Sequence, residues 1–532
     1  MAGAAALFNG HEVIAPIVLP LIAGACLILL EKARSRWVPW VSVAATLLQL
    51  MLAVLLFGQA SAGEVQAYLL GNWQAPYGIA LALDRLSALM LLLTTAVACG
   101  ALVYALGGDG DSARGLHFHA LFQFQLMGLA GAFLTADLFN LFVFFEVLLA
   151  ASYGLLLHGA TRQRLRASVH YVVFNLTGSA LFLVAVSLLY ALTGTLNMAD
   201  LAQKVPALPP QDLRLALAAA SMLLVVFAVK AALLPLYFWL PDTYAGASAP
   251  VAAMFAIMTK VGVYAIARMT TLVFGPAWLG AAALVLPTLA LATLVLAAIG
   301  VLAATQLRGL VAYLVVGSAG TLLLAVGLGT PGTLAAGLFY LVNSTLVAAA
   351  WFLIADRIAA ARGGVDRLDA RTWAGASAWA PLGVAFFIAA VAAAGVPPLA
   401  GFFGKALLLQ AAGQTPLAVW VVALVLGSSL AMMVALARAG STLFWKPASG
   451  ALPTGTTQSV SPSSAACTLA IVALLSAAVA TSVGAGPLSA YTAAAAQQLL
   501  ARQGYIDAVL GARPVAPAYD VRREMRERGD AK

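Results

Sequence analysis

The sequence contains very little charge. Only 9% of its 532 residues are charged and 63% are hydrophobic, whereas soluble domains average about 25% charged and about 45–50% apolar residues. A soluble protein with this balance could not cover its surface with polar groups, which excludes a cytosolic globular enzyme. The high hydrophobicity also excludes a disordered chain, which needs low hydrophobicity and high net charge. The composition is that of a polytopic membrane protein.

Residues that bind metals and cofactors are also scarce. The three cysteines each lie in an apolar stretch and are interpreted as packing residues, because their spacing fits neither a metal site nor a disulfide framework. The five histidines are scattered, apart from the weak pair His117 and His119, and there is no Gly-rich nucleotide loop. We therefore expect no metal and no cofactor. The net charge of +9 is attributed to basic cytoplasmic loops rather than to a nucleic-acid partner.

Apolar segments of spanning length follow one another along the chain. A span needs about 20 apolar residues. The segments cover residues 13–30, 37–58, 86–106, 117–135, 137–158, 168–193, 213–239, 251–274, 277–304, 308–329, 333–355, 379–410, 416–436 and 465–487. These 14 segments predict an all-α integral membrane protein with about 14 transmembrane helices. The first lacks a basic flank and a clear cleavage site, so we expect a retained helix rather than a signal peptide.

The distribution of basic residues between the loops predicts the orientation. Loops after odd-numbered segments carry 14 basic residues, whereas those after even-numbered segments carry Arg85, Lys204 and Arg214, with Arg268 at a helix end. The positive-inside rule then places the odd loops in the cytoplasm and both termini outside. The polar tail from about residue 488 contradicts this pattern, because it also carries arginines. Its alternating Arg and Glu residues are typical of a solvated helix that could contact a partner.

Four charged residues fall inside the apolar segments rather than in loops, at helix ends or in the tail. They are Glu146, Lys230, Lys260 and Lys405. A charge at the bilayer centre costs about 2.5–3.5 kcal/mol on insertion scales, so such residues persist when they pair or face a water-filled interior. We therefore predict that they form a proton path. The alternative, a snorkelling lysine or a purely structural ion pair, stays open for each of them.

Lysine is suited to proton handling at this depth. Burial disfavours the ammonium form and a nearby carboxylate favours it, so a mobile partner or a passing cation can change its protonation. Glu146 and Lys230 would form such a pair if their helices adjoin, and Lys260 and Lys405 would extend the row. His170 is a secondary candidate because imidazole titrates near pH 7. A structural role is favoured for the charged residues at segment edges, Asp84, Arg85, Asp137 and Arg268.

Helix breakers stand beside Lys230 and Lys405. Proline removes a backbone donor, and interrupted helix in lipid is tolerated where it is buried or lines a water cavity. We therefore predict two broken helices, whose hinges are Pro235, Pro241, Pro397, Pro398 and Gly401. Each break falls in the fourth of five consecutive segments, which favours two inverted five-helix repeats and a transport path between them. The alternative is that Pro and Gly are simply frequent in membrane helices.

The repeats divide the chain into predicted parts. Residues 1–116 form a three-helix N-terminal segment, and 117–274 the first repeat. Residues 275–440 form the inverted second repeat, and 441–532 the last transmembrane helix and a polar tail.

Two stretches of the sequence resemble the signatures of a known family. Residues 230–250 followed by Lys260, and Gly-Val-Pro-Pro-Leu-Ala-Gly-Phe-Phe-Gly-Lys at 395–405, are similar to motifs of antiporter-like subunits. These include the proton-pumping subunits of respiratory complex I and the large subunits of Mrp-type cation/proton antiporters. The resemblance extends over all predicted segments. It implies that Glu146, Lys230, Lys260 and Lys405 form the proton path.

Within that family the chain looks most like the D-type large subunit of a Mrp-type antiporter. Tyr237 stands where complex I subunits usually have histidine, and the length leaves no room for a long lateral helix. Asn343 and Ala348 stand where many relatives have histidine and lysine, which leaves the route from Lys260 to Lys405 open. A secondary polar path of water with Asn343, Ser344 and Thr345 could replace them.

The resemblance implies a subunit of a hetero-oligomeric Na⁺ or K⁺/H⁺ antiporter in the bacterial cytoplasmic membrane. The alternative is a non-redox, proton-pumping subunit of a respiratory NADH-quinone oxidoreductase. A non-transporting scaffold is disfavoured, because it would not need four buried charges. No carboxylate and carbonyl cluster favours Na⁺ over K⁺, and the cation site could lie on another subunit.

Overall fold

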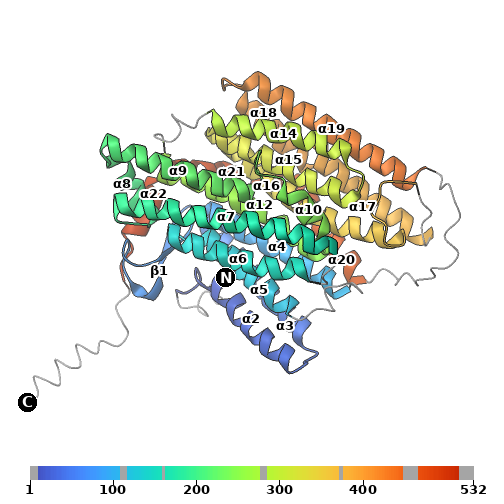
Figure 1. The fold of residues 1–532 in the computed structure, drawn as a ribbon, viewed down its shortest axis with the longest axis horizontal. Helices are drawn as coiled ribbons and strands as arrows, with labels where there is room; N and C mark the ends of the chain where they lie inside the picture. The colour runs from blue at the N-terminus through green and yellow to red at the C-terminus, as the bar shows by residue number, and fades with distance from the viewer. Residues whose placement is uncertain are drawn as a thin grey trace, which may run out of the picture.

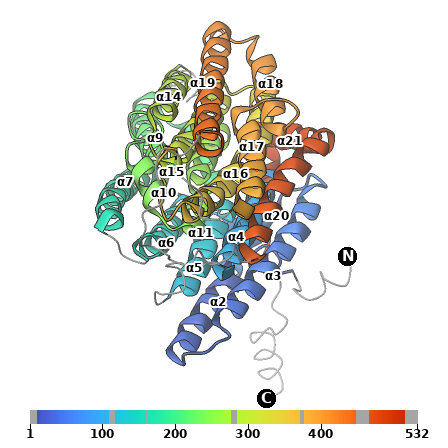
Figure 2. The same ribbon diagram turned by 90° about the vertical axis from the view of Figure 1, so that its right-hand side faces the viewer.

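The structure is a computed structural model that describes residues 10–107, 117–158, 162–275, 284–370, 376–446 and 465–514. It is a bundle of helices that run roughly alongside one another (Figure 1). Viewed along the bundle, α2 and α3 lie at one edge and α19 at the opposite edge (Figure 2). The helix α16 is buried along its whole spanning window and occupies the middle of the bundle.

The elements of the first part of the chain run from α2 to the end of the eighth predicted segment. They are α2 (Ala15–Lys32), α3 (Val38–Ala60), β1 (Gln66–Leu69), η1 (Leu70–Asn72), β2 (Ala80–Leu83), α4 (Arg85–Gly107), α5 (Phe118–Leu134), α6 (Leu138–Leu157), α7 (Arg162–Thr193), α8 (Met198–Lys204), η3 (Val205–Ala207), α9 (Pro210–Ala231), α10 (Trp239–Gly246), α11 (Ala249–Phe255), α12 (Met258–Arg268) and η4 (Met269–Val273).

The second part of the chain is helical throughout its described elements. They are α14 (Val285–Ala303), α15 (Leu307–Leu328), α16 (Pro331–Ala361), α17 (Ala376–Ala394), α18 (Ala400–Ala412), α19 (Ala418–Phe444), α20 (Ala465–Val483), α21 (Ala485–Leu500) and α22 (Gln503–Leu510).

The prediction of a helical membrane protein is confirmed. Within the described residues, 12 helices are long and apolar enough to cross a membrane, and α5, α17 and α18 supply shorter apolar helices. Each predicted segment coincides with one or more of these elements. The exception to an all-α fold is the antiparallel hairpin β1–β2, in which Gln66 pairs with Leu83. The division of the helices into two inverted repeats stays a prediction.

The helical region at the last predicted segment extends beyond the apolar residues from which it was predicted. The sequence predicts that it ends at 487, but helix continues through α20 and α21 to Leu500, with one residue, Gly484, between them. Here α21 packs against α16 and α4, and it buries Thr492 and Ala495. The interpretation of everything beyond 488 as a polar tail is therefore wrong up to residue 514. Small alanine side chains gave a weak hydropathy signal but allow close packing. The Arg- and Glu-rich stretch after 514 lies outside the described residues.

The loops predicted to share a side of the membrane meet at the same end of the bundle. The Ala136 amide donates to Ala80 O, and the Met198 amide donates to Ala136 O. These contacts bring together three even-numbered loops. At this end Arg268 forms an ion pair with Asp84, with 2.6 Å between Nη1 and Oδ2, and its guanidinium lies 5.0 Å from the Tyr505 ring. Both charged side chains are buried, which agrees with a structural role.

At the opposite end of the bundle, an arginine at the start of α15 connects several of the loops that follow odd-numbered segments. Arg308 forms an ion pair with Asp356 of α16, and the Tyr104 hydroxyl of α4 donates to the same carboxylate at 2.5 Å. The Arg308 guanidinium also donates to Ala247 O, just after α10. This cluster therefore anchors the second half of the first broken helix to the ends of three other helices.

Candidate proton path

The first break separates α9 from α10 over residues 232–238. Ala232 has a left-handed backbone, with φ of 58°, which ends α9 directly after Lys230 and Ala231. The Leu234 amide in the break donates to the Thr293 hydroxyl of α14 at 3.0 Å. Pro235 lies in the break. Pro241 instead lies in the first turn of α10, where proline is tolerated because no helical amide is needed.

The second break separates α17 from α18 over residues 395–399. Gly395 has φ of 78°, and Pro397 and Pro398 lie in the break. The Ala400 amide at the start of α18 donates to the Ser482 hydroxyl of α20 at 2.7 Å. Gly401 lies in the first turn of α18 rather than in the break, and a Cβ there would collide with Ala392 O. At each break, a hydroxyl from another helix therefore accepts a hydrogen bond from a backbone amide that the interruption leaves without a partner in its own helix.

Lys230 and Lys405 lie at the carbonyl ends of the first half-helices. Lys230 occupies the last turn of α9. Lys405 belongs to α18, but its ammonium reaches back to donate to Ala394 O, the last residue of α17, at 2.9 Å. It also donates to the Ser429 hydroxyl of α19 at 2.9 Å. A helix C-terminus carries partial negative charge that stabilises a cation. The second break therefore offers the Lys405 ammonium a site without a carboxylate, whereas the Lys230 ammonium makes no hydrogen bond to the end of α9.

Glu146 and Lys230 are neighbours but do not form an ion pair in this structure. Their helices adjoin, since the Phe145 and Phe227 ring centroids are 5.9 Å apart. The Lys230 ammonium lies over the Phe145 ring, 4.9 Å from its centroid, and among the described residues it has no hydrogen-bond partner. The Glu146 carboxylate instead accepts a hydrogen bond from Ser179 of α7. The pair is therefore separated, with a second partner holding the carboxylate.

Lys260 is completely buried, with 0% of its surface exposed. It lies in the first turn of α12, just after the interruption that separates α11 from α12. Its ammonium donates to the Ser318 hydroxyl of α15 at 2.9 Å and to the neighbouring Thr259 hydroxyl at 3.1 Å. Since both partners are uncharged, the lysine can bind or release a proton without breaking an ion pair.

The secondary residues predicted from sequence separate into two groups. His170 lies on the exposed face of α7, where its Nδ1 is 3.2 Å from Arg166 O, so the structure does not bring it to the buried lysines. Asn343, Ser344 and Thr345 are buried on α16. The Ser344 and Thr345 hydroxyls donate to Leu341 O of their own helix. Among the described atoms, the Asn343 amide oxygen has no partner.

The partners of the charged groups were missed by sequence analysis. They are the hydroxyls of Ser179, Ser318 and Ser429. The hydroxyls of Thr293 and Ser482, which accept from backbone amides at the breaks, were missed as well. Serine and threonine are common in membrane helices, where most of them bond to their own backbone. No local pattern distinguishes a hydroxyl that reaches a lysine on another helix. Only the packing of distant segments could have revealed these residues.

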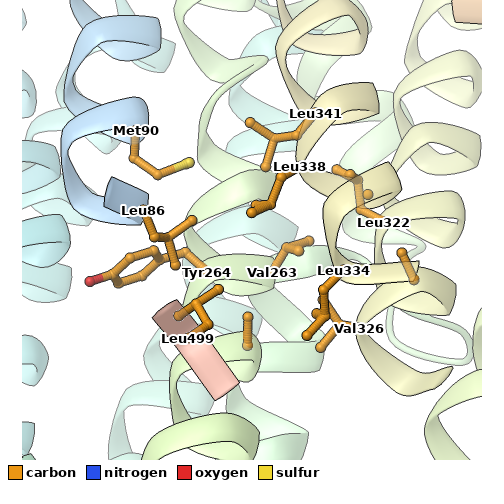
Figure 3. A pocket seen from close by; sticks show the side chains of 13 residues that line it. Leu86, Met90, Val263, Tyr264, Leu322, Val326, Leu334, Leu338, Leu341 and Leu499 are labelled. Atoms are coloured by element: carbon orange, nitrogen blue, oxygen red, sulfur yellow. The ribbon is translucent and has the colours of Figure 1, made fainter. Parts of the chain in front are cut away.

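Apolar side chains of α4, α12, α15 and α16 line a small cavity (Figure 3). On α12 its lining lies between Lys260 and Arg268, which pairs with Asp84 at one end of the bundle. Its volume is about 20 Å³, room for about one water molecule, and an apolar cavity of this kind stays dry. Its walls include Val263, three residues after Lys260, and Leu341, two residues before Asn343. The lining offers no polar group suited to a cation. The cavity is therefore part of an apolar layer between the buried lysine and that end.

No group of three or more His, Cys, Asp or Glu side chains that could hold a metal ion occurs within the described parts of the chain. The candidate site is thus a row of buried amines and hydroxyls with one carboxylate, an arrangement that can carry protons.

Comparison with known proteins identifies the family. Residues 135–431 match the family described as NADH:quinone oxidoreductase/Mrp antiporter, transmembrane. This chain belongs to that family. A relative from Rhizobium meliloti, named as the probable D-type subunit of a K⁺/H⁺ antiporter, is 42% identical and covers 94% of this chain and 98% of its own length. The D-type subunit of a Na⁺/H⁺ antiporter from Alkalihalophilus pseudofirmus is 36% identical over 75% of this chain and 80% of its own.

The fold is also similar to a solved member of the family. A chain from the structure of the Mrp complex from a Dietzia species superposes with a TM-score of 0.84 at 27% identity, covering 94% of this chain and 99% of the other. The matched region, 135–431, contains Glu146, Lys230, Lys260, Lys405 and both breaks. The motifs that suggested an antiporter-like subunit are thus inside the part of the chain that defines family membership.

Proposed function

We propose that this chain is the proton-translocating D-type subunit of a multisubunit monovalent cation/proton antiporter of the bacterial cytoplasmic membrane. It is a transporter subunit rather than a catalytic enzyme. The observation that carries the proposal is the placement of Lys230 and Lys405 at the carbonyl ends of two broken helices, with Lys260 buried in the same bundle. The ammonium groups of Lys260 and Lys405 are held by hydroxyl and backbone oxygens, and buried groups of this kind can exchange protons.

The first step of the proposed path is a change of partner by Glu146. In the structure Ser179 holds the carboxylate and the Lys230 ammonium lacks a hydrogen-bond partner among the described residues. Rotation of the carboxylate toward Lys230 would stabilise the charged ammonium, and its return to Ser179 would favour proton release. The two positions thus bias the protonation of Lys230, from which the proton passes to Lys260 and then Lys405.

Cation exchange requires that this charge movement be coupled to a second ion. A charge that crosses the membrane potential exchanges about 2.3 kcal/mol per 100 mV, so inward proton movement can drive the exit of Na⁺ or K⁺. The two breaks would form half-channels on opposite sides, as inverted repeats do in other transporters. The relatives' names include both K⁺ and Na⁺, and the cation site is assigned to the assembled complex.

The family description also names NADH:quinone oxidoreductase, so the alternative is a proton-pumping subunit of a respiratory complex. The curated relatives at 42% and 36% identity favour the antiporter. Purification of the native complex distinguishes the two. Small hydrophobic partner subunits without redox centres support the antiporter, whereas flavin- and iron–sulfur-containing partners support the respiratory complex.

The direct test is replacement of Lys230 by alanine in the complete complex. We expect cation-dependent proton exchange in everted vesicles to be abolished while the complex still assembles. Lys204→Ala is the matched control, because Lys204 is a half-exposed lysine paired with Asp200 at one end of the bundle. Unchanged exchange in an assembled Lys230→Ala complex would contradict the proposed function.

A further inference from the structure

The position of α15 and α16 leaves a gap in the proposed path. Lys260 lies on α12 and Lys405 on α18, and α15 and α16 pack between them. On α16 this chain has Asn343 and Ala348 where an ionisable link between the two lysines could stand, and neither side chain titrates. A proton that leaves Lys260 must therefore cross these two helices through groups of another kind.

We propose that a hydroxyl ladder of Ser318, Thr321 and Tyr340, completed by the Asn343 amide, carries the proton from Lys260 to Lys405. This inference rests on the proposed function and names the residues of one step within it. The ladder replaces the ionisable link with groups that each both accept and donate a hydrogen bond. It is specific to the residues that this chain has on the facing sides of α15 and α16.

The ladder begins on α15. Ser318 Oγ accepts from the Lys260 ammonium at 2.9 Å. Thr321 follows three residues later, so it lies on the same face of the helix as Ser318, and both side chains are buried. The Thr321 hydroxyl donates to Gly317 O at 3.0 Å, which leaves its oxygen lone pairs free to accept a proton donor from α16.

Tyr340 supplies that donor on α16. Tyr340 is 5% exposed, and its phenol interacts with the Thr321 side chain. The backbone of Tyr340 packs directly against Gly404, where a Cβ would lie only 2.9 Å from the Tyr340 Cβ. Glycine at 404 therefore lets α16 approach α18 one residue before Lys405. The phenol and the last lysine are consequently placed on helices in close contact.

Asn343 lies one turn beyond Tyr340 on the same face of α16. Its amide nitrogen points at α18, where a Cβ on Gly401 would lie 3.1 Å from Nδ2. Its amide oxygen is buried and, among the described atoms, has no partner. A buried acceptor of this kind is costly unless it is satisfied, and a water molecule between Tyr340 and Lys405 would satisfy it.

The proton transfers along the ladder balance. The Lys260 ammonium gives a proton to Ser318 Oγ as the serine passes its own to Thr321, and Thr321 in turn passes one to the Tyr340 oxygen. The Tyr340 proton moves through the water at Asn343 to the neutral amine of Lys405. Each oxygen gains one O–H bond and loses one, and the net result is a neutral Lys260 and a charged Lys405. The hydroxyls then rotate back to accept the next proton.

The test is Tyr340→Phe in the complete complex, assayed by cation-dependent proton exchange in everted vesicles. Loss of one proton-transfer group typically costs about 10²–10⁴ in rate, so we expect at least a tenfold lower maximal rate at unchanged half-saturating cation concentration. Tyr190→Phe is the matched control, since it removes a phenol from an exposed position on α7.

A rescue experiment separates a relay from a structural role. Imidazole both accepts and donates protons, so adding Asn343→His to Tyr340→Phe should restore exchange, which a lost packing contact would not allow. Unchanged exchange in Tyr340→Phe, or failure of the rescue in an assembled complex, overturns the ladder. If Lys260→Ala and Lys405→Ala still abolish exchange in that case, the proposed function stands without the ladder. If they do not, the proposed function fails as well.

Discussion

Ser179 of α7 donates a hydrogen bond to the carboxylate of Glu146 on α6. The carboxylate is thereby held away from the Lys230 ammonium, which lies over the Phe145 ring instead. The structure thus captures the state in which the acid and the lysine have separate partners. Because a transporter must pass through such a state in each cycle, the serine that stabilises it is expected to affect the rate.

Ser179→Ala tests this expectation. Without the serine, the carboxylate loses its second partner and stays with Lys230, so proton release becomes rarer. A hydrogen bond to a charged group contributes about 1.5–3 kcal/mol, which corresponds to a rate about 10- to 150-fold lower. Exchange in everted vesicles is the measurement, and Thr177→Val is the control, because its hydroxyl is exposed and bonds to Val173 of its own helix. Equal rates in both variants would contradict the role of Ser179.

The hydroxyls that hold the two breaks are expected to stabilise the fold. Thr293→Val leaves the Leu234 amide unsatisfied and Ser482→Ala does the same to the Ala400 amide, at a cost of about 1–3 kcal/mol each. Thermal unfolding of the purified complex in detergent should therefore begin at lower temperature in each variant. Thr293→Ser keeps the hydroxyl and should restore stability at the first break. Ser221→Ala, at an exposed serine bonded to its own helix, should have no effect. If Thr293→Val and Ser482→Ala unfold like this control, the hydroxyls do not hold the breaks.

The buried pair of Arg268 and Asp84 gives a third prediction. Removing one partner leaves an uncompensated buried charge and costs about 3–5 kcal/mol, whereas replacing both by apolar residues is often neutral. We expect Asp84→Leu and Arg268→Met each to lower the yield and thermal stability of the complex, and the double variant to recover most of the loss. A double variant that is as unstable as the sum of the singles would show that the two residues do not stabilise the fold as a pair.

Stability should depend on pH through Asp137, the N-cap of α6. Burial raises the pKa of its carboxyl to about 6, although hydrogen bonds from the Asn140 and Phe139 amides oppose this shift. The folded state therefore favours the protonated carboxyl of Asp137. Its contribution to the free energy of unfolding is complete at pH values below its ordinary pKa of 3.8 and is lost as the pH rises through about 6.

Asp137→Asn keeps the oxygen that accepts from the Asn140 amide and stays neutral. The variant should unfold at a higher temperature than the wild type at pH 7, and the difference should shrink as the pH is lowered. Parallel melting curves at several pH values measure this. A difference that is independent of pH would show that Asp137 is not the titrating group.

The sequence was sufficient for the helical fold, whereas the proton path along the lysines stays a prediction, and the reason that these lysines could be singled out is energetic. Charge is so costly in an apolar segment that Lys230, Lys260 and Lys405 stand out individually, and proline marks both breaks. The hinge positions of Pro241 and Gly401 were wrong by a few residues, because both residues also fit the first turn of a helix. The end of the last span was wrong because alanine is only weakly hydrophobic.

The hydroxyls on other helices that bond to the lysines and to the two breaks could not be predicted, since each of these contacts joins distant segments. Ser318 is 58 residues from Lys260 and Ser482 is 82 residues from Ala400. Whether a side chain is exposed also depends on how the helices pack, and the sequence alone does not show this. His170 lies within an apolar segment, as a buried candidate would, but the side of α7 that carries it faces away from the bundle.

The most direct test of the central claim is proton exchange by the complete complex, purified and reconstituted in liposomes, with Lys260→Ala beside Lys204→Ala. Lys260 is fully buried and Lys204 lies in a partly exposed ion pair. We predict that Lys204→Ala exchanges protons for Na⁺ or K⁺ at the wild-type rate and that Lys260→Ala, equally well assembled, does not. Wild-type exchange by an assembled Lys260→Ala complex would show that protons do not pass along the buried lysines.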